Sequence, residues 1–248
     1  MKENSLMKRM GILLASARFI FAEKGLWYSL HAASSILFGY VFYKVFRSFR
    51  TFSFQGRRYR YFYHLRNTTW KNERTIEIPI VWETVRKYDN HKILEVGNVL
   101  FNYFTFPHDV VDKYEKEKGV VNRDIVDFHP AQKYDLIISI STLEHVGWDE
   151  PIKDPEKTLH TVHHLKSLLR SGGEMVITMP LGHNPDMDRL LREDKIQFTK
   201  IYCMERISRD NRWNEVSWES IRSKYPGSPF PADNSLLLIG YVKQAGQG

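Results

Sequence analysis

The sequence predicts a doubly wound α/β sheet of seven strands, the last one antiparallel, that follows an aromatic and basic N-terminal helical extension. Residues 1–70 carry 12 basic and 2 acidic residues and 17 of the 34 aromatic ones, whereas residues 71–248 carry 24 basic and 27 acidic residues. From residue 72 onward, apolar strand-like runs alternate with helix-like patterns, an order typical of a parallel sheet covered on both faces. We therefore expect an extension over residues 1–66 and an α/β domain over residues 67–248.

The extension contains 19 uncharged positions, residues 25–43, followed by Lys44 and five arginines that end at Arg60. This length is borderline for a membrane-spanning helix. The run contains His31, three serines, and tryptophan and tyrosine residues that prefer the membrane interface. We expect residues 25–60 to lie on an anionic membrane surface rather than cross the bilayer.

Two other interpretations of the extension stay open. Its aromatic side chains can pack on the following domain, as aromatic stripes commonly do. Alternating arginine and aromatic residues over Gln55–Tyr63 could contact nucleic acid. The net negative charge of residues 71–248 makes nucleic acid an unlikely partner.

The number of cysteines and the absence of several motifs exclude some classes of protein. Cys203 is the single cysteine, which excludes an intrachain disulfide and favours a cytoplasmic protein, peripheral at the inner face of the membrane if the extension docks there. The sequence has no phosphate-loop motif, no Cys/His metal spacing and no G-x-S-x-G elbow.

The elements of the domain are expected in a regular order. Pro79 is expected to begin a helix before the first strand. Asp154 should cap a later helix that starts at Pro155 and stops at Gly172-Gly173. Strands are expected over residues 92–97, 108–113, 120–124, 134–140, 174–179, 197–206 and 235–242.

Five short motifs occur in order along these strands. They are Ile-Leu-Glu95-Val-Gly97, Asp112 after the second strand, Asp124 after the third, the run from Tyr134 to Val146, and the run from Leu168 to Pro180. This series resembles the motifs of class I S-adenosylmethionine-dependent methyltransferases and covers about residues 72–248. The resemblance implies a Rossmann-like fold, S-adenosyl-L-methionine as cofactor, and O-methylation of a small-molecule, lipid or glycan acceptor.

The resemblance also implies a set of cofactor contacts. Gly97 and the residues after the other parallel strands should converge at the carboxyl edge of the sheet, where strand order reverses. Glu95 would face the methionine ammonium, Asp112 the ribose hydroxyls, and Asp124 with the backbone of Ile125 the adenine. The full expected set is Glu73, Arg74, Glu95, Gly97, Asn98, Asp112, Asp124, Ile125 and Ser141.

His145 is the candidate catalytic base, paired with Glu144, because its ordinary pKa near 6.5 suits proton transfer. A structural histidine is the alternative. In some relatives such a pair binds a metal with a glutamate three residues upstream; Ser141 stands there, so we expect no metal. The loop over residues 182–186 is expected to form the substrate rim.

The glycine-rich turn departs from the family pattern. It reads Gly97-Asn98-Val99-Leu100-Phe101 and lacks two of the family's three glycines, although Asn98 tolerates a positive φ better than other non-glycine residues. This departure keeps a second function open, a catalytically inactive methyltransferase-fold binding or scaffold protein at a membrane surface.

Overall fold

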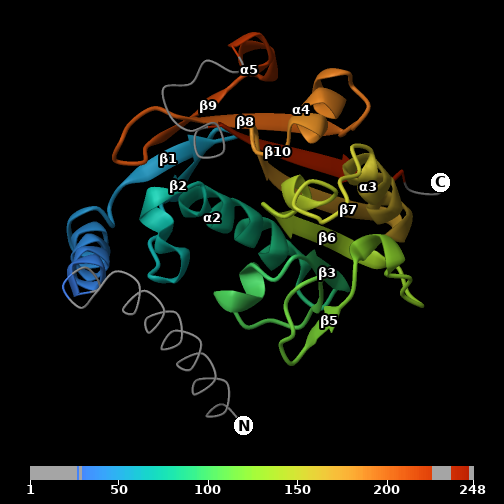
Figure 1. Cartoon of the computed structure of the whole chain (residues 1–248), viewed down its shortest axis with the longest axis horizontal. Coiled ribbons are helices and arrows are strands. Elements are labelled where there is room, and N and C mark those ends of the chain that lie inside the picture. The colour runs from blue at the N-terminus through green and yellow to red at the C-terminus, as the bar shows by residue number, and fades with distance from the viewer. Residues whose placement is uncertain (1–26, 28–29, 225–235, 246–248) are drawn as a thin grey trace. The chain divides into compact units, whose positions relative to one another are not determined.

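The structure is a computed structural model that describes residue 27, residues 30–224 and residues 236–245 (Figure 1). The chain divides into two compact units. One comprises the described residues of Met1–Phe49 with Tyr63–Trp70, and the other comprises those of Arg50–Phe62 with Lys71–Gly248.

The larger unit is built on a sheet in the order β5-β4-β3-β6-β7-β10-β8-β9. The first five of these strands are parallel, and β10 runs antiparallel between β7 and β8. The predicted doubly wound, Rossmann-like sheet with an antiparallel last strand is therefore confirmed. The predicted count of seven strands is wrong, because β9 adds an eighth at the edge. The strands are β3 (Ile93–Val96), β4 (Asp109–Asp112), β5 (Val120–Asn122), β6 (Tyr134–Ile140), β7 (Leu169–Pro180), β8 (Lys200–Arg206), β9 (Trp213–Val216) and β10 (Leu236–Lys243).

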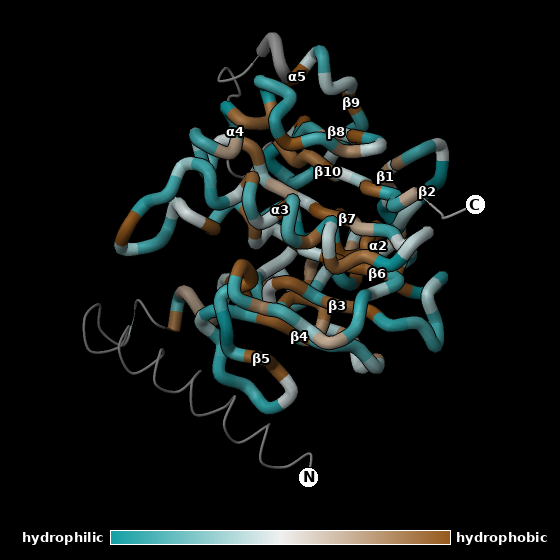
Figure 2. The backbone as a smooth tube through the Cα atoms, turned by 90° about the vertical axis from the view of Figure 1, so that its right-hand side faces the viewer, coloured by the Kyte–Doolittle hydropathy of each residue, from teal (hydrophilic) through white to brown (hydrophobic). Residues whose placement is uncertain are grey.

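Helices cover both faces of this sheet. The α-helices are α2 (Arg74–Val85), α3 (Lys157–Leu168), α4 (Pro185–Arg192) and α5 (Trp218–Lys224). One core cluster joins Ile137 of β6 to Val162 of α3 and Leu190 of α4. The alternate residues of β6 face the opposite side, where α2 packs. Hydrophobic colouring gathers on the middle strands and on α2 (Figure 2), as expected for strands buried on both faces.

Pro79 does not begin α2, as the sequence suggested, but lies inside it. A proline cannot donate to the carbonyl four residues earlier, so the oxygen of Thr75 is left free by the helix. The N–H of Phe62 donates to this oxygen at 2.9 Å. Pro79 therefore leaves a carbonyl oxygen of α2 available to Phe62, and this hydrogen bond attaches the chain after β2 to the helix.

The start and the stop predicted for α3 are also displaced. Its N-cap is Glu156, while Asp154 accepts the N–H of Glu156 at 3.0 Å in the turn before the helix. The helix passes into β7 at Leu169, and Gly172-Gly173 lie within that strand, where its pairing with β6 shifts register.

The segment after residue 50 contributes a hairpin of β1 (Thr51–Phe54) and β2 (Arg57–Arg60) to the larger unit. Phe52 and Phe54 are buried, and the ring of Phe54 meets Tyr202 of β8 edge-on at 5.4 Å. For these side chains, packing on the domain, the alternative stated above, is the one observed. Arg50 and Arg57 form ion pairs with Asp210 and Glu83.

In the smaller unit, residues 30–46 form a helix. Tyr43 packs between Tyr63 and Trp70, with ring centroids at 5.1 and 6.3 Å. An apolar stripe at helical spacing stays exposed; it consists of Leu30, Leu37, Phe38, Val41 and Val45. Within the described residues, no helix is long and apolar enough to cross a membrane.

Candidate functional site

The parallel strands end together at one edge of the sheet. Strand order reverses between β3 and β6, since β4 and β5 follow on one side and β7 on the other. In doubly wound sheets, ligands bind outside the carboxyl ends of the strands at this switch point. The turns after β3, β4, β5, β6 and β7 carry most of the candidate residues, and α2 carries Arg74.

Gly97 holds the turn after β3 against the turn after β6. Its φ is +83°, and a β-carbon at this position would lie 2.2 Å from Oγ1 of Thr142. Its N–H donates to Val111 at 2.9 Å. Asn98 has no positive φ, so the left-handed conformation belongs to Gly97. A side chain at position 97 would therefore push apart the two turns that flank the switch point.

Glu95 does not face a ligand as the resemblance implied. It is fully buried, and its carboxylate accepts the N–H groups of Val99, Leu100 and Phe101 in the turn that follows β3. Nε2 of His108 lies 2.8 Å from its Oε2. These four partners give Glu95 the role of holding the turn, and they occupy the carboxylate oxygens that a contact with the methionine ammonium would need.

Asn98 and Asp112 meet at the ends of β3 and β4. The N–H of Asn98 donates to Oδ2 of Asp112 at 3.1 Å, and Oδ1 of Asp112 accepts the N–H groups of Tyr114 and Glu115 at 2.8 Å. The side-chain amide of Asn98 donates to Glu115. Among the residues that the structure describes, Oδ2 of Asp112 accepts one hydrogen bond, and a carboxylate oxygen can take two.

The carboxylate of Asp124 is part of a network of ion pairs, whereas the resemblance implied a contact with adenine. Its Oδ2 lies 2.8 Å from Nζ of Lys113 and 2.7 Å from Nζ of Lys157, and both lysines also contact Glu150. Burial opposes ionisation, but the two ammonium groups hold the pKa values of Asp124 and Glu150 below their ordinary range. Ile125 is buried in the core cluster. The predicted adenine contact of Asp124 therefore competes with two lysines.

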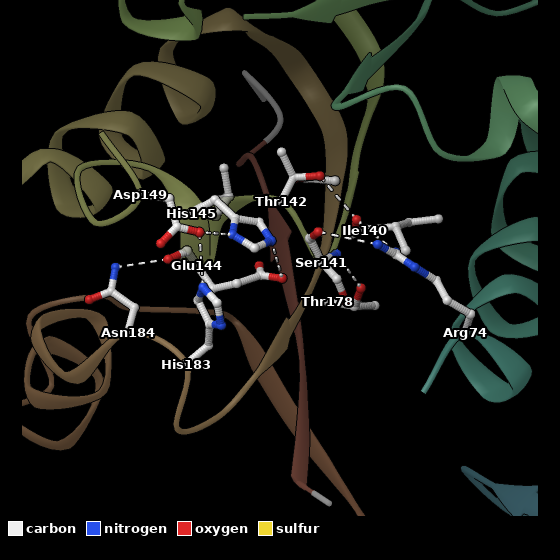
Figure 3. A network of polar contacts seen from close by, with 12 residues as sticks. Arg74, Ile140, Ser141, Thr142, Glu144, His145, Asp149, Thr178, His183 and Asn184 are labelled. Atoms are coloured by element: carbon white, nitrogen blue, oxygen red, sulfur yellow. Dashed lines mark hydrogen bonds and ion pairs between the residues drawn. The ribbon is translucent and has the colours of Figure 1, made fainter. Parts of the chain in front are cut away.

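Arg74 joins α2 to the end of β6. Its guanidinium donates to the oxygens of Ile140 at 3.0 Å and Ser141 at 3.4 Å (Figure 3). It also lies 3.4 Å from Oε2 of Glu77. Ser141, with a φ of +38°, is held in this unusual conformation by its N–H bond to Thr178 at 3.0 Å.

Glu77 is a site residue that the sequence analysis missed. It is fully buried, and its Oε1 accepts the hydroxyls of Ser141 and, at 2.6 Å, Thr178. Burial disfavours a charged guanidinium, but Glu77, Glu73 and Glu144 raise the pKa of Arg74. The spacing of Arg74 and Glu77 by three residues on one helix was the available signal.

Glu144 is a buried acid in this region. It is 2% exposed, and its Oε2 has no hydrogen-bond partner among the described residues. Burial raises the pKa of Glu144 well above its ordinary value; Arg74 opposes this, and Glu77 and Glu73 add to it. Glu77 lies 3.4 Å from the guanidinium, and Glu73 and Glu144 act on it through their charge. A further cation near Glu144 would favour the ionised form of this buried carboxyl group.

His145 and Glu144 lie side by side, as their sequence order requires. Asp149, which the sequence analysis did not single out, joins them, as does His183 from the loop expected to form the substrate rim. Nδ1 of His145 lies 2.5 Å from Oδ2 of Asp149, and Nε2 of His183 lies 3.1 Å from the same oxygen (Figure 3). On its other side, Nε2 of His145 lies 3.6 Å from Oε1 of Glu144. Burial alone would raise the pKa of Asp149, but the two imidazoles lower it below its ordinary value.

Comparison with known proteins found similar structures, but no matching protein family and no matching curated sequence. The N-methyltransferase NodS from Bradyrhizobium japonicum WM9, in complex with S-adenosyl-L-homocysteine, is 13% identical, with 69% of this chain and 87% of NodS covered and a TM-score of 0.45. A SAM-dependent methyltransferase from Archaeoglobus fulgidus is 15% identical, with 74% and 100% covered and a TM-score of 0.44. Magnesium protoporphyrin IX methyltransferase (ChlM) from Synechocystis PCC 6803, with bound SAM, is 10% identical, with 73% and 83% covered and a TM-score of 0.41. These low identities and TM-scores leave the function to be inferred from the residues of this chain.

Proposed function

We propose that this protein is a methyltransferase that uses S-adenosyl-L-methionine. The observation that carries the proposal is the group of buried carboxyls, Glu73, Glu77 and Glu144, around Arg74 at the switch point. S-adenosylmethionine brings a sulfonium and an ammonium group, which such a region stabilises, and a carboxylate, which a guanidinium can bind.

The turn after β3 supports the choice of this ligand over a dinucleotide. Dinucleotide sites bind pyrophosphate with the free N–H groups of this turn and of the helix that follows it. Here the carboxylate of Glu95 accepts the N–H groups of Val99, Leu100 and Phe101, and a short 3₁₀ helix over Leu100–Asn102 follows. A ligand without phosphate fits this turn better than one with phosphate.

Individual residues would hold the cofactor in this way. The backbone at Gly97 would face it closely, Oδ2 of Asp112 would accept a ribose hydroxyl, and Arg74 would bind its carboxylate. Glu73, Asn98 and Ser141 would contact the cofactor in the same region. Asp124 and Ile125 follow β5, and an adenine contact of Asp124 would have to replace its ion pairs with Lys113 and Lys157. When bound, the cofactor supplies an electrophilic methyl group on its sulfonium sulfur.

His145 and Glu144 are proposed to serve the acceptor. Oδ2 of Asp149 accepts a hydrogen bond from the Nδ1–H of His145, which leaves the lone pair of the neutral ring on Nε2. The imidazole side chain is 46% exposed, so it can reach the hydroxyl of a small-molecule, lipid or glycan acceptor. The acceptor would be identified by screening a labelled methyl donor over lipid, glycan and phenol pools.

Calorimetry with S-adenosylhomocysteine on the full chain tests the proposal. We expect binding in the micromolar range, weakened at least about tenfold in Asp112→Ala, because a hydrogen bond to a charged group is worth about 1.5–3 kcal/mol. Asp109→Ala is the matched control, since Asp109 begins the same strand that Asp112 ends. No binding at high micromolar ligand, or equal binding by Asp112→Ala, would favour the inactive scaffold instead.

A second function is favoured by the exposed apolar stripe of the helix over residues 30–46. We propose that this helix of the N-terminal segment 1–66 lies on an anionic membrane surface, with Lys44 beside the stripe. The chain has no acidic residue from Lys24 to Lys71, so nothing in that stretch repels anionic headgroups. Arg50 and Arg57 contribute less than expected, because carboxylates of the larger unit pair with them.

Vesicle co-sedimentation tests the membrane proposal. Binding to phosphatidylserine vesicles should fall strongly in Leu37→Glu/Val41→Glu, because two charges would enter the apolar interface. Ile152→Glu, at an exposed residue of the larger unit, should bind as the wild type does. Equal binding by both variants would contradict this proposal and leave the methyltransferase proposal untouched.

A further inference from the structure

Two imidazoles and one carboxylate converge in the turns that follow β6 and β7. His145, Asp149 and His183 each offer a ligand atom, and these atoms all lie within 4.8 Å of one another. His145 and Asp149 follow β6, and His183 follows β7, so residues distant in sequence meet here (Figure 3). We propose that these three residues bind a divalent transition-metal ion of the Zn²⁺ type.

The donor set suits this class of ion. Imidazole nitrogens with one carboxylate favour Zn²⁺, Co²⁺ or Fe²⁺, whereas Mg²⁺ and Ca²⁺ favour oxygen ligands. Three protein ligands leave one position of a tetrahedral site open for water or for an oxygen of the acceptor. The donor set differs from the one that the sequence analysis considered, since it uses neither Ser141 nor Glu144 as a ligand.

Two of the three distances between ligand atoms are close to those of a tetrahedral site, and the third, between the two imidazole nitrogens, is within 4.8 Å. Ligand atoms about 2.0–2.1 Å from a tetrahedral ion stand about 3.3 Å apart. The pair of His183 and Asp149 already stands at 3.1 Å, and the pair of His145 and Asp149, at 2.5 Å, must open slightly. The three side chains are 27–46% exposed, so rotations about their side-chain bonds can bring this about.

The backbone that carries the ligands is held in place. The N–H of Asp149 donates to the oxygen of His145 at 3.0 Å, which forms one helical turn and puts both side chains on one side. The amide of Asn184, next to His183, donates to the oxygen of Glu144 at 3.0 Å. This bond ties the two loops together, and preorganised ligands of this kind favour metal binding.

Glu144 has a defined place in this site. Metal-binding histidines commonly donate their second ring N–H to a carboxylate, which fixes the ring. With Nδ1 of His145 on the ion, Nε2 carries the proton and faces Oε1 of Glu144, 3.6 Å away. The base role of His145 therefore belongs to the metal-free form. Metal binding itself does not depend on the proposed methyl transfer. A role of the ion at the methyl acceptor rests on that proposed function.

Metal titration of the chelator-treated full chain tests the inference, with Zn²⁺ followed by calorimetry and Co²⁺ by its visible absorption. We expect one ion per chain, with affinity at least about tenfold lower in Asp149→Asn and His183→Ala. His163→Ala, which removes an exposed histidine of α3, should bind as the wild type does. Since the replaced side chains are at the surface, thermal unfolding should show all variants folded.

Two results would overturn the inference: no stoichiometric binding by the wild type, or equal affinity in Asp149→Asn, His183→Ala and the control. S-adenosylhomocysteine binding, measured on the same samples, separates the two proposals. Cofactor binding without metal binding refutes the metal site alone, and metal binding without cofactor binding refutes the methyltransferase proposal alone.

Discussion

Thr142 occupies the space that any side chain at Gly97 would need. The Oγ1 of Thr142 lies 2.2 Å from the position of a β-carbon on residue 97, and its Cγ2 lies at 2.7 Å. The two residues follow β3 and β6, the strands on either side of the switch point. Their contact sets how closely the two turns approach.

Gly97→Ala should therefore lower the free energy of unfolding by about 2–5 kcal/mol, from a positive φ and a clash together. Gly172→Ala is the matched control: its φ is +77°, but no atom lies within 4 Å of a β-carbon there. It should cost about 1–2 kcal/mol. Urea unfolding measures both, and equal losses would mean that the contact with Thr142 is unimportant.

Glu77→Ala should destabilise the protein by about 3–5 kcal/mol, since it leaves the Arg74 guanidinium without its buried partner. It also removes the acceptor of two hydroxyl groups, on Ser141 and Thr178. Glu193→Ala, which breaks an exposed ion pair with Arg189, should change stability by less than about 0.5 kcal/mol. Chemical denaturation of both variants checks this, and similar values would contradict the role given to Glu77.

Lys157→Met should lower stability near neutral pH and lose that effect in acid. The lysine holds the pKa values of Asp124 and Glu150 below their ordinary range. A lowered carboxyl pKa contributes stability above the unfolded-state value, about 4, and the contribution is lost as pH falls through the folded-state value. The urea midpoints of variant and wild type should therefore differ near pH 7 and converge near pH 3.

The exposed Lys195 gives the control for this experiment. Lys195→Met should show no comparable convergence with pH. A gap between Lys157→Met and the wild type that stays constant down to pH 3 would contradict the ion-network explanation.

Cys203 should be inert in the folded protein. The residue is fully buried in β8, and burial, with Glu219 and Glu215, raises the pKa of its thiol to about 12. Because the thiolate is the reactive form, a thiol reagent should label the protein after denaturation and not before. Ile207→Cys, at a 48% exposed position just after β8, provides a reactive control. Rapid labelling of the native wild type would contradict the buried environment.

The sheet could be predicted from the sequence because each parallel strand is an apolar run with its own boundaries. β6 was predicted with its observed limits, Tyr134–Ile140. β9 was missed, since Trp213–Val216 is short and half exposed, and a strand of this kind is defined by its neighbour β8.

Some of the site residues could likewise be predicted from the sequence, and others could not. Motif order predicted Gly97 and Asp112 at the ends of two neighbouring strands, where local turns hold them. It could not find that Glu77 meets Thr178, 101 residues away, or that His183 meets Asp149. It also misjudged Glu95, because the partners of a carboxylate depend on how the next turn folds.

The carboxylate of Glu95 occupies the N–H groups of the turn after β3. This affects whether abundant phosphate-containing molecules can compete for the site. ATP and NAD are abundant, and a crevice of this topology with free backbone N–H groups would be exposed to them. To bind here through phosphate, either would first have to displace a carboxylate that is covalently part of the chain and buried. Ligand binding at this turn should therefore be insensitive to the concentrations of ATP and NAD.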